Sequence, residues 1–341
     1  MKKAIVPSSE TKNPLRDSYI DFLRGLGLLL LVVAHTWAPL TLTSIRTFDV
    51  PLMVIVSAMC YKPIQKDFIS IKTYLWKRFL RIYVPVFIFV NLFFTAILCV
   101  EAYVGKNVFS VYQYIGSLFL LNAPSIGYVW IMRVFLMMAL VLPFIEPLFK
   151  RLKPVGLVIT LFSITILQEC VILLFTYIPN GIVKFVLSET IPYIIGYSVF
   201  TAIGLRVNGF TYGQKIFLTA LAGIGCLIYL LLTGNYLPQE NKYPPHGLYL
   251  LWGWCGSCIL ILCKPLLNGI ASWRCWSYLS KNSMWIYLWH IIPIYLITPL
   301  AVRPQVWLVR YLLVLGIALL LNYIYHLIIS RFPKRIHKYI S

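Results

Sequence analysis

Charged side chains are scarce in this sequence, and acidic ones are the scarcest. Of its 341 residues only 12% are charged, and 10 Asp and Glu face 30 Lys and Arg. Soluble domains carry about a quarter charged residues and less than half apolar ones, whereas 60% of this chain is hydrophobic. No soluble core could bury so much apolar surface. We therefore expect lipid to be the solvent for most of the chain.

Several motifs that carry chemistry in soluble proteins are also missing. We find no glycine-rich phosphate loop, zinc-ligand spacing or nucleophile elbow, so we expect no metal. Cys255 and Cys258 form a C-x-x-C without a second pair or a histidine pair, which favours inert thiols. A signal peptide would end in a cleavage site of small residues, and the first apolar run has none. No soluble basic module is present to bind nucleic acid.

Long apolar runs recur along the chain and predict an all-α membrane protein. Each run is about the length that spans a bilayer as a helix, and short polar segments separate the runs. The segment 111–122 is too short to span and is typical of an interfacial or re-entrant piece. We expect a bundle of about ten transmembrane helices, at roughly 20–40, 46–61, 82–103, 128–148, 155–178, 185–204, 216–233, 247–263, 283–301 and 305–330.

The positions of the basic residues predict the orientation of these spans. Most Lys and Arg fall in the segments that share a side with the N-terminus, and few fall in the alternate loops. Basic loops stay in the cytoplasm, so we expect both termini there. The chain then divides into a cytoplasmic N-terminal segment (1–19), a transmembrane domain (20–330) and a basic cytoplasmic tail (331–341).

The first span holds three ionisable residues in an otherwise apolar run: Asp21, Arg24 and His35. Such groups are costly in a membrane and need a partner or a water-filled cavity. Arg24 and His35 are eleven residues apart, about three helical turns, so they share one face and lie roughly 16 Å apart along the axis. Asp21 and Arg24 could instead form a local ion pair. Histidine is the usual general base near neutral pH, so His35 is the candidate catalytic residue.

A basic cluster, Lys77, Arg78 and Arg81, lies just before the third span. Arg78 and Arg81 are three residues apart, so one helical face presents both guanidinium groups. Guanidinium groups bind phosphate oxygens in pairs, which indicates a ligand rich in phosphate. The alternative is plain cytoplasmic charge that orients the helix or contacts anionic lipid.

Other polar residues within the spans give weaker signals. His290 lies mid-span with Tyr287 one turn before it, and a packed pair is as plausible as a substrate contact. Glu169 and Glu189 fall in the outer halves of their spans. Either could pair with Arg133 or orient the histidine of the first span.

Six segments in order resemble the acyltransferase-3 family of bacterial membrane proteins. They are DFLRGLGLLLLVVAH, FDVPLMVIVSAMCY, KRFLRIYVPVFIF, YVWIMRVFLMMALVLP, IPYIIGYSV and LSKNSMWIYLWH. The spacing of Arg24 and His35 and the pair Arg78 and Arg81 are the specific parts of the likeness. The sequence departs from the family pattern at Ala58, where glycine is usual, and at Ile131, where phenylalanine is usual. These departures concern the packing around Ser57 and Trp130.

The resemblance implies a ten-helix enzyme of the bacterial cytoplasmic (inner) membrane. Such enzymes transfer an acyl group, most often acetyl, from acyl-CoA to sugar hydroxyls of envelope glycans such as O-antigen or exopolysaccharide. The partners implied are therefore acetyl-CoA, as acyl donor, a membrane-linked or surface glycan as acceptor, and the bilayer. The residues implied are His35 and Arg24 for catalysis, with Lys77, Arg78 and Arg81 for acyl-CoA binding.

These expectations combine into one hypothesis with one alternative. The arginines would hold the CoA phosphates at the cytoplasmic surface, and His35 would deprotonate the acceptor hydroxyl. The alternative is an exporter of polysaccharide intermediates, in which the ionisable residues line a transport path. An exporter would have no need of a CoA phosphate site.

Overall fold

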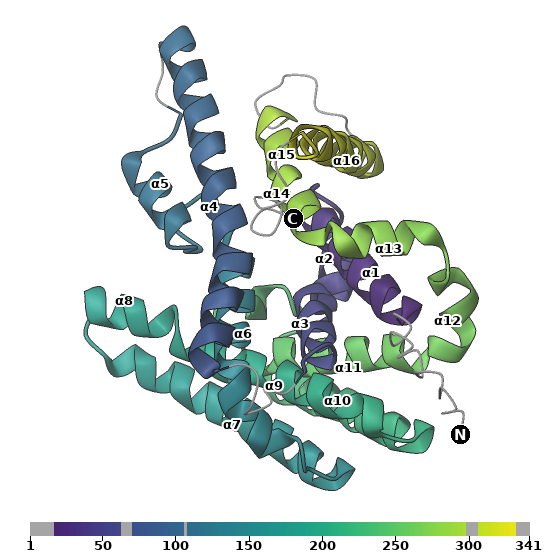
Figure 1. The fold of residues 1–341 in the computed structure, drawn as a ribbon. Coiled ribbons are helices and arrows are strands. Elements are labelled where there is room, and N and C mark those ends of the chain that lie inside the picture. Colours follow the sequence, from purple (N-terminus) through teal and green to yellow (C-terminus); the bar gives the residue numbers. More distant parts are fainter. Residues whose placement is uncertain (1–16, 63–69, 106–107, 298–305, 332–341) are drawn as a thin grey trace, which may run out of the picture.

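The computed structural model describes residues 17–62, 70–105, 108–297 and 306–331, and every regular element among these residues is a helix (Figure 1). The predicted all-α class is therefore confirmed for the part of the chain described. The elements are α1 Ser18–Ala34, α2 Leu40–Ile45, η1 Arg46–Phe48, α3 Asp49–Met59, α4 Ile71–Val104, α5 Val111–Leu118, α6 Trp130–Phe149, α7 Pro154–Tyr177, α8 Ile182–Ser188, α9 Ile191–Arg206, η2 Val207–Gly209, α10 Tyr212–Thr233, η3 Glu240–Lys242, α11 Gly247–Leu262, α12 Lys264–Ala271, α13 Arg274–Lys281, α14 Ser283–Trp289, α15 Ile291–Ile297 and α16 Trp307–Ile329.

Among the described residues, seven helical stretches are long and apolar enough to cross a membrane, and two of them join adjacent shorter elements, Leu40–Met59 and Ile182–Gly209. An eighth is reached if α11 and α12, which meet at a bend of 71°, are counted as one span. The protein is thus a multi-pass membrane protein. Two predicted spans fall outside this count because α1 has 17 residues and α14–α15 form a shorter apolar pair. The end of the predicted span 283–301 lies outside the described residues, as do most of both terminal segments.

Helix α3 lies in the middle of the bundle, in contact with α1, α9 and α11 (Figure 1). Its approach to α9 is very close. A Cβ atom placed on Gly204 of α9 would lie 2.4 Å from the carbonyl oxygen of Ile55 and 2.6 Å from the Cβ of Ala58. Ala58 is buried here. The alanine is therefore tolerated, because the facing residue is a glycine.

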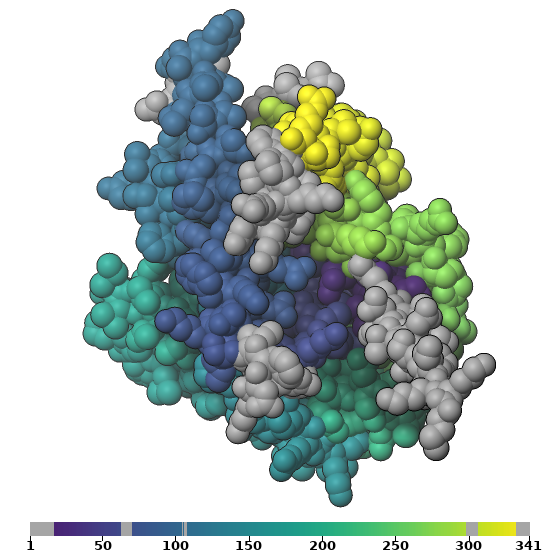
Figure 2. All heavy atoms as spheres, viewed as in Figure 1, coloured from purple at the N-terminus to yellow at the C-terminus, as the bar shows by residue number. Residues whose placement is uncertain are grey.

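Helix α4 is the longest element, with 34 residues. The Ser70 side chain accepts a hydrogen bond from the backbone of Thr73 at its start, and Gly105 ends it in the left-handed conformation, as glycine commonly does. Its C-terminal half and α5 form a ridge that projects from the body of the molecule (Figure 2). Apolar side chains such as Leu98 and Tyr103 are exposed on this ridge, which fits contact with lipid.

Two short elements match and refine the sequence-based expectations. Helix α5 has eight residues and a capping box between Ser110 and Gln113, so this segment is indeed too short to span. The predicted span from residue 283 is broken instead of continuous: α14 ends at Trp289, α15 begins at Ile291, and His290 stands at the break.

Candidate active site

A cavity of about 420 Å³ lies between α1, α3, α4, α6, α13 and α14, and we call it the arginine cavity. Its cationic side chains are Arg24, Arg78, Arg81 and Lys281. The other end is formed by the side chains of helices α1, α6 and α14, which include Leu31, Met132 and Tyr287. A cationic end and a largely apolar end suit a ligand with phosphates at one end and a less polar chain at the other.

Arg24 is positioned by α13, which packs along α1. The Ser280 hydroxyl donates a hydrogen bond of 2.7 Å to Asp21, and Ser280 also lies 3.5 Å from the Arg24 guanidinium. A second nitrogen of Arg24 lies 3.5 Å from the sulfur of Cys60. Ser280 thus contacts both Asp21 and Arg24. These two of the three ionisable residues in the first predicted span lie beside the cavity.

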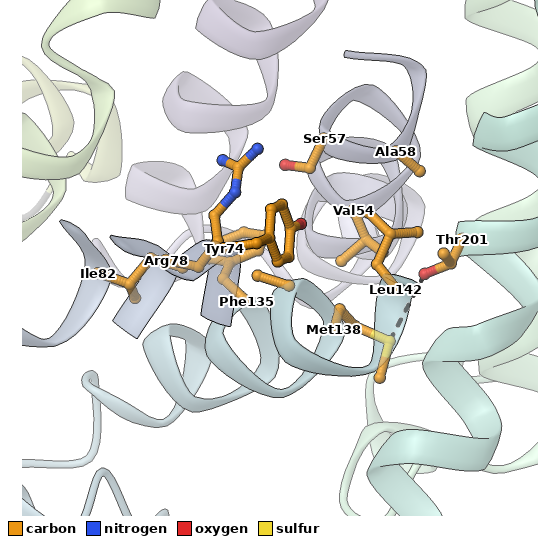
Figure 3. Close-up of a pocket in the computed structure, with 11 residues that line it drawn as sticks. Val54, Ser57, Ala58, Tyr74, Arg78, Ile82, Phe135, Met138, Leu142 and Thr201 are labelled. Carbon is orange, nitrogen blue, oxygen red and sulfur yellow. Dashed lines mark hydrogen bonds between the residues drawn. The ribbon is translucent and has the colours of Figure 1, made fainter. Parts of the chain in front are cut away.

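Arg78 and Arg81 both line the arginine cavity, as their three-residue spacing predicts. Figure 3 shows the Arg78 guanidinium turned toward the Ser57 hydroxyl, beside a smaller cavity of about 100 Å³. The Arg78 guanidinium also lies 5.1 Å from the centre of the Tyr74 ring. Lys77 is placed elsewhere: it is exposed and lines an open, mostly apolar groove with Trp76 and Phe79. The structure does not bring Lys77 to the arginine cavity.

His35 ends helix α1 and contacts His290 directly. The distance between His35 Nδ1 and His290 Nε2 is 2.9 Å, and the two rings stack with centroids 5.1 Å apart. Nδ1 of His290 is hydrogen-bonded to the backbone carbonyl oxygen of Tyr287. The ring of Tyr128 meets His35 edge-on, with centroids 4.7 Å apart. His290 therefore serves as the polar partner of His35, which the sequence left open.

This chain of contacts fixes which nitrogens carry hydrogen. A carbonyl oxygen only accepts, so His290 must donate from Nδ1 to Tyr287. In a neutral imidazole the other nitrogen then accepts, so His290 Nε2 receives the hydrogen of His35 Nδ1. The remaining nitrogen of His35, Nε2, is left with a free lone pair. That is the state a general base requires.

The arginine cavity ends close to this histidine pair. Leu31, the last residue of α1 among its lining residues, is four residues before His35, about 6 Å along the helix. Tyr287 connects the two regions: its side chain lines the cavity, its hydroxyl donates 2.5 Å to the carbonyl oxygen of Tyr128, and its own carbonyl holds His290. Arg24 and His35 thus lie along one helix, with the cavity covering most of the length between them.

A buried charged cluster is formed by residues of η1, α3 and η3, and it was not predicted from the sequence. Arg46 and Asp49 form an ion pair with side chains 2% and 0% exposed, and Arg46 also donates 3.1 Å to Gln239. Lys242 is buried above the Trp130 ring, 5.3 Å from its centre. Burial lowers the pKa of Lys242 to about 8, which the charge of Arg46 reinforces and that of Asp49 opposes. The i,i+3 spacing of Arg46 and Asp49 is the sequence signal that could have indicated this pair.

The two glutamates of the outer halves take different partners, and neither one hydrogen-bonds His35. Glu189 forms an ion pair of 2.5 Å with Arg133. Glu169 accepts hydrogen bonds from the Tyr229 hydroxyl and from the first backbone N–H of α11, at 3.0 and 2.5 Å, and its other oxygen lies 2.9 Å from His246. Glu169 therefore caps the start of α11.

Within the described residues, no group of three or more His, Cys, Asp or Glu side chains is placed to hold a metal ion. The polar side chains that the described residues bring together here are the imidazole pair and the guanidinium groups. These groups suit proton transfer and the binding of anions.

Comparison with known proteins assigns the chain to a family. No curated protein and no solved structure matches it. The family profile of the acyltransferase-3 proteins, described as an acyltransferase domain, matches residues 17–327, nearly the whole chain. This range contains the arginine cavity and the histidine pair. The chain belongs to the acyltransferase-3 family, and the family indicates that it is a membrane acyltransferase.

Proposed function

We propose that this protein transfers an acyl group, acetyl in the first instance, from cytoplasmic acyl-CoA to a sugar hydroxyl of a bacterial envelope glycan. The observation that carries the proposal is the arrangement along α1. Arg24 lines a cationic cavity near the start of this helix, and His35 ends the helix beside His290. One helix thus connects an anion-binding region to a general base.

The donor side of the proposal is supported by the shape and charge of the arginine cavity. The phosphates of acyl-CoA would bind Arg78 and Arg81, with Arg24 and Lys281 beside them. The less polar pantetheine arm would follow the cavity toward Leu31 and Tyr287. The thioester would then lie next to the histidine pair.

The acceptor side follows from the lone pair on His35 Nε2. This nitrogen would take the proton of the acceptor hydroxyl while the hydroxyl oxygen attacks the thioester carbonyl carbon. The carbon–sulfur bond breaks, and the CoA sulfur leaves with the proton returned from His35. His290 would stabilise the charged intermediate state of His35, since a hydrogen bond from a protonated imidazole is stronger than one from a neutral ring. The bonds formed and broken and the transferred proton therefore balance, and no further reactant is needed.

We propose ten spans, with both termini in the cytoplasm of a bacterium and the protein in its inner membrane. The seven long helices and α11 give eight. The other two are α1, whose 17 residues reach the lower length limit of a spanning helix, and the broken pair α14–α15. In this orientation Arg78 and Arg81 face the cytoplasm, where acyl-CoA is made.

Measurement of acetyl-CoA affinity tests the donor site. For the purified protein in nanodiscs, we expect Arg78→Ala and Arg81→Ala each to raise the Kd for acetyl-CoA about tenfold or more, because each removes a charge-assisted contact worth about 1.5–3 kcal/mol. Lys77→Ala is the matched control, since Lys77 is a neighbouring cation on the same helix outside the cavity. An equal loss of affinity in all three variants would point to general charge attraction and would contradict a specific phosphate site.

A further inference from the structure

A second cavity, of about 190 Å³, is built from polar and aromatic side chains, and we call it the tyrosine cavity. Its aromatic walls include Tyr193 and Tyr243, and its polar groups are Asn122, Ser188 and Glu189. It lies where the segment after α5, the end of α7, the α8–α9 junction and the loop before α11 meet. None of these elements carries the cationic residues of the arginine cavity. In the proposed orientation this cavity faces the outer side of the membrane.

The tyrosine cavity holds unused hydrogen-bonding capacity. Glu189 lines the cavity, and its buried Oε2 pairs with Arg133 but receives no well-aligned hydrogen bond from any described group. The Arg133 side chain is nine-tenths buried, and apart from this ion pair its three nitrogens make no well-aligned hydrogen bond to any described group. The guanidinium also packs on the Tyr193 ring, 4.8 Å from its centre. A carboxylate acceptor and guanidinium donors thus lie side by side against an aromatic wall.

These groups favour a neutral sugar ring over other ligands. Sugar hydroxyls both donate and accept, so one ring can donate to Glu189 and accept from Asn122 or Ser188. The apolar C–H face of a sugar can pack on a tyrosine ring. The charges of Glu189 and Arg133 offset each other, so the cavity offers no net positive charge for a phosphate. Its volume is less than half that of the arginine cavity.

Neither His35 nor His290 lines the tyrosine cavity. The ring of Tyr243 meets that of Trp130 edge-on at 4.8 Å, and Tyr128, two residues earlier in the chain, contacts His35. A sugar in this cavity would therefore not present its own hydroxyl to His35. It would instead be a neighbour, along the same glycan, of the sugar that is acylated.

We propose that the tyrosine cavity is a subsite for a neutral sugar of the acceptor glycan, one that flanks the acylated sugar and is held by Glu189 and Asn122; this inference rests on the acyltransferase function proposed above. The subsite sets which glycan is accepted. It takes no part in the chemistry of transfer.

The test compares the apparent KM for the acceptor with that for the donor. The full-length protein in nanodiscs is given radiolabelled acetyl-CoA and, as acceptor, the surface glycan extracted from cells that lack the protein. We expect Glu189→Gln to raise the KM for the glycan about tenfold, with the KM for acetyl-CoA changed less than twofold. Ser188→Trp, which fills the cavity without touching the ion pair, should act in the same direction and provides a second variant should the first not fold.

The matched control is Glu146→Gln. Glu146 also forms an ion pair on α6, with Lys150 at 3.3 Å, but at the opposite end of that helix. We expect this variant to leave both KM values unchanged. If Glu189→Gln and Ser188→Trp fold but leave the KM for the glycan unchanged, or raise both KM values equally, the sugar subsite is wrong. If the unaltered protein does not acylate the glycan at all, the failure lies with the proposed function instead.

Discussion

At the scale of single residues, His290 determines which ring nitrogen of His35 carries the hydrogen. Its Nε2 accepts from His35 Nδ1, and Tyr287 holds its other nitrogen. We expect His290→Ala to lower kcat about 100-fold with little change in the KM for acetyl-CoA, because the base loses its orientation while the donor site is untouched. His290→Gln can restore an acceptor for His35 and should recover part of kcat.

The control for this prediction is His326→Ala. His326 is a histidine on α16 that contacts Asn282 at 2.6 Å and has no contact with His35 among the described residues. We expect this variant to keep its kcat. A fall in kcat of the same size in both histidine variants would contradict a specific role of His290.

Lys242 makes a prediction about stability and pH. Its pKa is about 8 in the folded protein against 10.5 for an ordinary lysine. Between these values the unfolded chain binds more protons than the folded one, so the contribution of Lys242 to folding stability rises with pH. Below pH 8 both states are protonated, and the burial penalty is fully present. We expect the Tm of the unaltered protein, relative to that of Lys242→Met, to rise between pH 7 and pH 10. Differential scanning fluorimetry measures both Tm values. A constant difference in Tm would show that the Lys242 ammonium is solvated.

At this scale the sequence predicted residues within one helix better than pairs between helices. The shared helical face of Arg78 and Arg81 follows from periodicity, whereas only the resemblance groups them with Arg24 of α1. The pairing of His35 with His290, and of Arg133 with Glu189, depends on which helices pack together, and a single sequence carries no such information. Lys77 shows the limit of a charge cluster, since neighbouring cations on a helix point in different directions.

At the scale of elements, helices α3 and α9 approach each other very closely. Gly204 lets α9 approach the backbone of Ile55, so Gly204→Ala forces the helices apart. We expect a loss of about 1–3 kcal/mol in the free energy of unfolding, seen as a lower Tm in detergent. Gly213→Ala on α10 is the control, because a Cβ atom there would have no neighbour within 4 Å. Equal Tm values for the two variants would contradict this close packing.

The sequence analysis predicted that the helices exist, but it did not predict where they are interrupted. An apolar run long enough to span must satisfy its backbone groups internally, and a helix does so. Each interruption has a proline close by in the sequence: Pro293 follows the break at His290, and Pro265 lies in the first turn of α12 after the bend. Proline lacks the backbone N–H that continues a helix. The residues after 297 that complete the predicted ninth span lie outside the described part of the chain.

At the scale of the whole molecule, two cavities with different chemistry are lined by different residues. The arginine cavity carries four basic residues, and the tyrosine cavity carries Glu189, which pairs with Arg133. This arrangement would let a charged donor and a neutral glycan approach one reaction centre by separate routes. The donor would then transfer its acyl group without leaving the cytoplasmic side.

Mass spectrometry of the surface glycan tests this account most directly. Cells that carry the unaltered protein are compared with cells that carry His35→Ala, with acetyl-CoA binding measured on each purified protein. The account predicts that the variant binds acetyl-CoA normally while its glycan loses the mass of one acyl group per modified unit. A fully acylated glycan in the variant cells would contradict the role of His35 as the base, and disappearance of the whole glycan from the surface would indicate export instead of acyl transfer.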